Sequence, residues 1–112
     1  MRSLIRMTTL LTAALVCPVS AMANEEYFGA IVTEVYSYNT ADNCVHFLLS
    51  GVSQADPAVP NNGWFAISKT NASAEDAYAA LVAAKVSGTT LHIRTDGTVS
   101  CGNATASLVS LN

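Results

Sequence analysis

Two histidines are the residues whose side chains most readily bind a metal ion or transfer a proton. His46 lies in an expected strand at residues 44–51, and His92 lies in another at 89–95. No cysteine, aspartate or glutamate stands at metal-ligand spacing beside either histidine in the sequence. We therefore predict that both are structural, on outward and solvent-facing sides of their strands, and that the chain holds no metal.

Residue sets for catalysis are equally sparse. The chain has many serines, but it has no G-x-S-x-G motif and no serine, histidine and acid that the pattern brings together. Glu25 and Glu26 stand near the start of the expected domain, and Glu75 and Asp76 suit the start of a helix. We predict no catalytic residue, no cofactor and no enzymatic activity.

Aromatic residues offer a better candidate site. Tyr36 and Tyr38 fall near the end of an expected strand at 27–39, and Trp64 opens another at 64–69. Such rings can stack on sugars or peptides, and we add His46 as a polar neighbour. The predicted ligand-binding set is thus Tyr36, Tyr38, His46 and Trp64. The alternative is that these rings only cover the surface or fill a subunit contact.

The first 23 residues have the pattern of a secretory signal peptide. Arg2 and Arg6 give a basic start, "MTTLLTAALV" is a short apolar run, and "AMA" at 21–23 is a cleavage signal. The apolar run is shorter than the roughly 20 residues that span a bilayer. We expect cleavage after Ala23, a bacterial source, and a secreted or periplasmic protein without a membrane span. Residues 24–112 then form one small domain of 89 residues.

The net charge argues against a nucleic-acid partner, and the cysteines indicate an oxidising compartment. After cleavage, three cationic side chains oppose eight carboxylates, a net charge of −5 with neutral histidines. Such a domain lacks the basic stripe that nucleic-acid binding requires, so we expect no nucleic-acid partner. Cys44 and Cys101 are predicted to form a disulfide in an oxidising compartment. A reactive or metal-binding thiol pair is disfavoured because no CxxC spacing occurs.

The pattern predicts a mainly β domain with one helix. Strands are expected at 27–39, 44–51, 64–69, 89–95 and 104–112, with apolar residues such as Phe47, Phe65 and Ile93 inward. A helix is expected from an N-cap at Ser73, with Asp76 completing a capping box, to a C-cap at Gly88. A turn is expected at 96–97. This order, with the helix between the third and fourth strands, fits a five-stranded OB-fold-like barrel whose open end the helix plugs. The alternative is an α+β sandwich with the helix across one face.

Over residues 27–112 the chain resembles the B subunits of AB5 toxins, of the subtilase-cytotoxin and pertussis-like kind. The likeness rests on Cys44 at the start of the second strand, "GWFAISK" at 63–69, "VSGTTLHIR" at 86–94, and Cys101 after it. The resemblance implies a homo-pentameric ring that binds cell-surface glycans. This chain lacks the family's additional cysteine pair, and its glycan-contacting serine motif has no counterpart here, so no binding residue is carried over.

The sequence therefore predicts an exported OB-fold-like binding module, oligomeric and glycan-directed, like an AB5 toxin B subunit. The alternative is an exported structural or inhibitory protein that binds another protein without catalysis. The ligand itself is not specified by these residues.

Overall fold

The computed structural model describes residues 25–37, 43–59 and 62–111. The expected signal peptide at 1–23 and the candidate residue Tyr38 lie outside the described residues. The described chain is mainly β with one helix, in the order β1 (Glu26–Ala30), β2 (Val32–Ser37), β3 (Cys44–Leu49), β4 (Trp64–Ser68), α1 (Ala74–Ser87), β5 (Leu91–Ser100) and β6 (Asn103–Leu111). No helix among these residues is long and apolar enough to cross a membrane.

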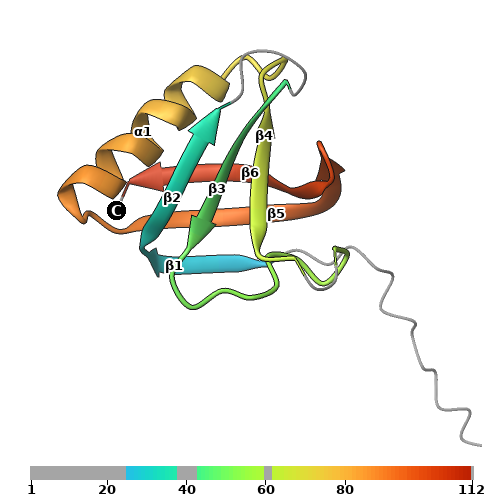
Figure 1. Cartoon of the computed structure of the whole chain (residues 1–112), viewed down its shortest axis with the longest axis horizontal. Helices are drawn as coiled ribbons and strands as arrows, with labels where there is room; N and C mark the ends of the chain where they lie inside the picture. The colour runs from blue at the N-terminus through green and yellow to red at the C-terminus, as the bar shows by residue number, and fades with distance from the viewer. Residues whose placement is uncertain (1–24, 38–42, 60–61, 112) are drawn as a thin grey trace, which may run out of the picture.

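All six strands belong to one sheet with the order β1-β5-β6-β4-β3-β2. Every neighbouring pair is antiparallel except β4 and β6, which pair in parallel at Phe65–Ala104 and Ala66–Thr105. In Figure 1, β2, β3 and β4 form a front layer, and β1, β5 and β6 cross behind it at a steep angle. The sheet is therefore strongly coiled, and its concave side encloses the core.

The expected five strands in a closed barrel were wrong in both strand number and closure. The first predicted strand divides at Ile31 into β1, which pairs with β5, and β2, which pairs with β3. Gly29 has a φ of 64°, and register shifts occur on both sides of Ile31. A bulged, glycine-containing run bends sharply, so its two halves pair with different neighbours. The two outermost strands of the sheet are consequently consecutive in the chain.

The core lies between the two layers of the sheet and is closed at one side by α1. The inward residues predicted for the second, third and fourth strands are all buried there, and Phe47 and Phe65 stack with ring centroids 4.9 Å apart. The helix contributes Leu81 together with small alanines, and packs against β2, β3 and β6. The buried apolar cluster includes Val45, Phe47, Leu49, Phe65, Ile67, Leu81, Ala84, Leu91 and Ile93.

The ends of α1 confirm one predicted cap and correct the other. Gly88 adopts the left-handed conformation with φ of 75°, and its N–H donates to the carbonyl oxygen of Ala84 at 2.8 Å. Ser73 stands at the N-cap position, but its side chain makes no capping bond. Its hydroxyl instead donates to Oδ1 of Asn71 at 2.9 Å, so the predicted capping box with Asp76 does not form. The serine hydroxyl therefore bonds within the turn that precedes the helix and not to the helix itself.

The predicted turn at 96–97 was also misplaced. β5 continues through it to Ser100, and the chain reverses at Cys101 and Gly102 instead. Gly97 has a φ of 82° and lies within a register shift between Thr95 and Val99. A bulge absorbs the left-handed residue without ending the strand, which lengthens the β5–β6 hairpin beyond the sequence prediction.

Candidate functional site

The predicted disulfide is present and links two distant parts of the sheet. Cys44, the first residue of β3, is bonded to Cys101 in the turn between β5 and β6. Cys44 is buried, whereas Cys101 is exposed. The bond therefore holds the tip of the β5–β6 hairpin beside the start of β3. Disulfides of this kind are typical of proteins that fold in an oxidising compartment.

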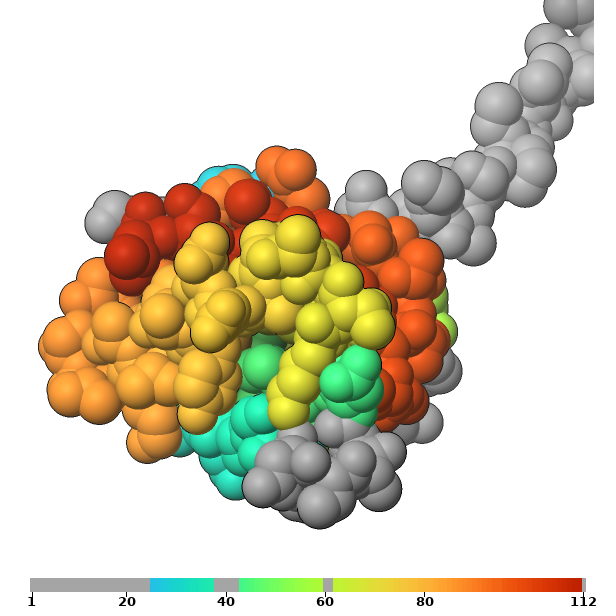
Figure 2. All heavy atoms as spheres, turned by 90° about the horizontal axis from the view of Figure 1, so that it is seen from above, coloured from blue at the N-terminus to red at the C-terminus, as the bar shows by residue number. Residues whose placement is uncertain are grey.

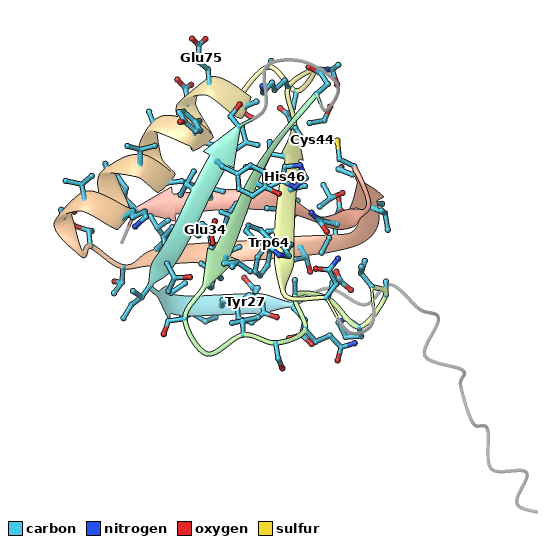
Figure 3. The ribbon with its side chains drawn as sticks, viewed as in Figure 1. Tyr27, Glu34, Cys44, His46, Trp64 and Glu75 are labelled. Atoms are coloured by element: carbon cyan, nitrogen blue, oxygen red, sulfur yellow. A yellow bond between two sulfur atoms is a disulfide. The ribbon has the colours of Figure 1, made fainter. Side chains whose placement is uncertain are left out.

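Three of the four predicted ligand-binding residues meet on one face of the front layer. Tyr36 of β2 stands directly opposite His46 of β3, and their rings stack with centroids 5.0 Å apart. Trp64 of β4 meets Tyr36 edge to face at 5.2 Å. Figure 3 shows His46 and Trp64 over the front strands. Val35, Phe47 and Phe65, which alternate with them, point into the core, so the aromatic trio lies on the outer side of the sheet.

We call the outer surface of β2, β3 and β4 that carries Tyr36, His46 and Trp64 the aromatic face. Tyr36 and Trp64 are half-buried, so part of each ring remains accessible to solvent. His46 is only 2% exposed, because Tyr36 stacks on it. The prediction of a solvent-facing His46 was therefore wrong. The side chain lies on the outer side of β3, as predicted, but the ring of Tyr36 covers the imidazole.

A chain of hydrogen bonds holds His46 in place. The backbone N–H of Trp64 donates to Oδ1 of Asn62 at 2.8 Å, and Nδ2 of Asn62 donates to Oδ1 of Asn103 at 2.6 Å. Nδ2 of Asn103 in turn lies 2.8 Å from Nδ1 of His46. Because a backbone N–H can only donate, each amide in the chain has a defined orientation. Nδ1 of His46 is the acceptor, which selects the tautomer protonated on the other ring nitrogen.

Sequence analysis did not identify Asn62 and Asn103 as part of this site. Asn62 stands in the loop before β4 and is followed by a glycine. The glycine after it is required, since a Cβ atom at Gly63 would lie 2.7 Å from the carbonyl oxygen of Val52. Asn103 reaches His46 through the parallel pairing of β4 with β6, and no local pattern predicts such a long-range pairing.

His92 has a different environment on β5. Its Nε2 atom lies 2.8 Å from the carboxylate of Glu26, and Phe28 stacks on its ring at 4.3 Å. The guanidinium of Arg94 also binds Glu26 at 3.0 Å. Hydrogen bonds from Arg94, and then from His92, hold the pKa of the Glu26 carboxyl below its usual range. Glu26, near the start of the domain, thus lies in β1 and joins a surface ion pair.

The two histidines lie on β3 and β5, which are not neighbours in the sheet. Within the described ranges, no group of three histidine, cysteine or acidic residues is placed to hold a metal ion. His46 bonds to an amide and His92 to a single carboxylate, and neither arrangement assembles a nucleophile with a base.

A buried carboxylate fastens the long loop after β3. Asp56 is fully buried, and its two oxygens accept the backbone N–H of Ala58 at 2.9 Å and that of Gly97 at 3.0 Å. Beside it, the Tyr27 hydroxyl donates to the carbonyl oxygen of Ala55 at 2.8 Å. Burial raises the pKa of that hydroxyl. These bonds attach the loop to β1 and β5, and thereby support the turn that leads into Trp64.

A sizeable hollow lies away from the aromatic face. It has a volume of 480 Å³ and lies at the start of α1, where Figure 2 shows it between the first helical turns and the front strands. Its lining consists of Ser37, Val45, Lys69, Thr70, Asn71, Ala72, Ala74, Glu75 and Tyr78. Ser37 directly precedes residues 38–42, which are outside the described chain, so we base no site on this hollow.

Comparison with known proteins adds no relative to this description. No family model matches the chain, and no curated protein matches it significantly.

Proposed function

We propose that the chain is an exported, non-catalytic OB-fold-like module that binds a glycan through the aromatic face. Its resemblance to the B subunits of AB5 toxins suggested this class of function. The contacts among the described residues now give the proposal a specific surface. The aromatic face is the surface on which it depends.

The strand connections support an OB-fold-like arrangement. The outermost strands of the sheet, β1 and β2, are joined through Ile31 alone, and the carbonyl oxygen of Ile31 accepts the N–H of Ser50 at 2.8 Å. One continuous, bent run thus borders both ends of the sheet, with α1 between β4 and β5. OB-folds commonly bind ligands on the face of their second and third strands, which correspond to β3 and β4 here.

The single observation that carries the proposal is the meeting of Tyr36, His46 and Trp64. They come from three different strands, and the register places them on the side away from the core. Aromatic rings left partly accessible on an otherwise ordered sheet face suit the apolar faces of sugar rings. The disulfide and the signal-peptide pattern are both consistent with export.

The experiment uses Trp64 as its own reporter, because it is the only tryptophan in the chain. The mature protein would be screened against a glycan array, and hits would be titrated by tryptophan fluorescence and calorimetry. We expect Trp64→Ala to weaken binding at least tenfold, about 1.4 kcal/mol. Phe28→Ala is the matched control, since Phe28 is an exposed aromatic residue on β1. A blank array, with no effect of Trp64→Ala on any binding, would refute glycan binding at this face.

A second candidate is protein binding through α1. Tyr78, Val82 and Val86 are exposed at i, i+4 and i+8, so they form an apolar stripe on one side of the helix. Self-association into a ring, as the resemblance suggests, and contact with another protein would both cover this stripe. Light scattering on a sizing column separates them. A discrete oligomer that dissociates in Val86→Lys indicates self-association, whereas a monomer directs attention to another protein.

A further inference from the structure

The aromatic face carries one carboxylate, that of Glu34. In the antiparallel register Glu34 stands opposite Leu48, and Leu48 stands opposite Trp64. Because alternate residues share a face, Glu34 lies on the same side of β2 as Tyr36. Figure 3 shows Glu34 on the front strands together with Trp64 and His46. The side chain is exposed, and it makes no hydrogen bond or ion pair with the other described residues.

The spacing brings Glu34 within reach of a ligand on the rings. Residues two apart on a strand are separated by about 7 Å, and two strand spacings measure about 9.5 Å. Glu34 is therefore one such step from Tyr36 along β2 and one from Trp64 across the sheet. A sugar ring that lies on either aromatic residue brings its substituents toward this carboxylate.

Positive charge is found elsewhere on the described chain. Lys69 lines the hollow at the start of α1, Lys85 stands in the last turn of α1, and Arg94 is bonded to Glu26. The charge of the aromatic face is therefore negative, and the expected mature chain is acidic as a whole. An anionic sugar would meet an uncompensated carboxylate there, whereas a cationic substituent would gain a charge-assisted hydrogen bond.

We propose that the glycan bound at the aromatic face is an amino sugar with a free primary amine, whose ammonium group pairs with Glu34 while its ring lies on Trp64. This inference rests on the proposed glycan-binding function. A sugar fits better than a lysine side chain because the face is an open sheet surface with two rings at 74°. An alkyl chain would cover little of such a surface.

The test compares two oligosaccharides that differ only at the amine. Glucosamine tetramer and its N-acetylated counterpart would be titrated into the mature protein by Trp64 fluorescence at low and high salt. We expect about tenfold tighter binding of the free amine at low salt, which corresponds to one charge-assisted hydrogen bond. Added salt should reduce this preference, because the carboxylate is exposed.

Two isosteric variants localise the effect. Glu34→Gln should remove the preference for the free amine. Glu75→Gln, which neutralises an exposed carboxylate in the first turn of α1, should retain the preference. Equal or tighter binding of the acetylated tetramer would overturn the inference, and so would a preference that persists in Glu34→Gln. Displacement of the glucosamine tetramer by an equal concentration of a lysine tetrapeptide would indicate a protein ligand instead.

The failure of this inference differs from the failure of the proposed function. A neutral or acidic glycan whose binding depends on Trp64 but not on Glu34 would overturn the amine requirement and leave glycan binding standing. No response to any glycan, together with no effect of Trp64→Ala, would remove both.

Discussion

Replacement of Asn103 by alanine tests whether the amide chain stabilises the aromatic face. The substitution removes the bonds of Asn103 to His46 and Asn62 while leaving the backbone pairing of β6 intact. His46 is 2% exposed, so its Nδ1 atom loses the hydrogen bond from Asn103 and gains no access to water in exchange. An unsatisfied buried polar atom costs about 1–3 kcal/mol. We therefore expect a loss of about 2 kcal/mol in the free energy of unfolding.

The measurement is urea unfolding of the mature protein, followed by Trp64 fluorescence and by far-UV circular dichroism. For a domain of this size, the expected loss corresponds to a fall in Tm of about 10 °C. Asn71→Ala is the matched control, because Asn71 is exposed and its side-chain oxygen accepts hydrogen bonds from Ser73 within its own turn. We expect that control to lose less than about 1 kcal/mol. If Asn103→Ala and Asn71→Ala cost the same, the amide chain does not stabilise His46.

Three further predictions concern the disulfide, the helix and the surface ion pair. Removing the Cys44–Cys101 bond, which spans 57 residues, should cost about 4 kcal/mol by urea unfolding, and labelling of either cysteine in the unreduced protein would contradict the bond. Leu81→Ala should cost about 2–5 kcal/mol because Leu81 is fully buried, whereas Val82→Ala on the exposed side should cost far less. The lowered pKa of Glu26 stabilises the fold above the usual carboxylate pKa, and this contribution is lost as the pH falls through the folded value. Glu26→Gln should therefore lower Tm at neutral pH but not below that range, and a Tm difference independent of pH would disprove the linkage.

Much of the local structure was predictable because it depends on short patterns. The inward residues of the second, third and fourth predicted strands, the helix with its C-cap at Gly88, and the disulfide all follow from alternation, capping and cysteine count. The helix face was less predictable. Of the apolar residues at helical spacing, Leu81 enters the core, whereas Tyr78, Val82 and Val86 are exposed. The other buried residues of the helix are Ala74 and Ala84, whose small side chains allow close approach to the sheet.

The remaining errors arise where one chain segment serves two partners. One strand was expected at 27–39, and its division at Ile31 into two strands with different neighbours depends on pairing with distant segments. An Asp-Gly pair is typical of a hairpin turn, but here the left-handed Gly97 lies in a β-bulge. Its backbone N–H donates to the carboxylate of Asp56, which is distant in the sequence. In both cases tertiary pairing overrides a local signal.

The arrangement of the candidate site also depends on contacts between distant segments, which the sequence did not predict. Tyr36, His46 and Trp64 could be named from the sequence, but the groups that orient them come from the loop before β4 and from the β5–β6 hairpin. The disulfide holds the hairpin tip beside β3, and Asn103 stands two residues beyond Cys101. A covalent bond and a directed chain of hydrogen bonds thus act on the same strand that carries His46. Because the rings are ordered before any ligand arrives, a ligand at this face would not have to offset the entropy of ordering them.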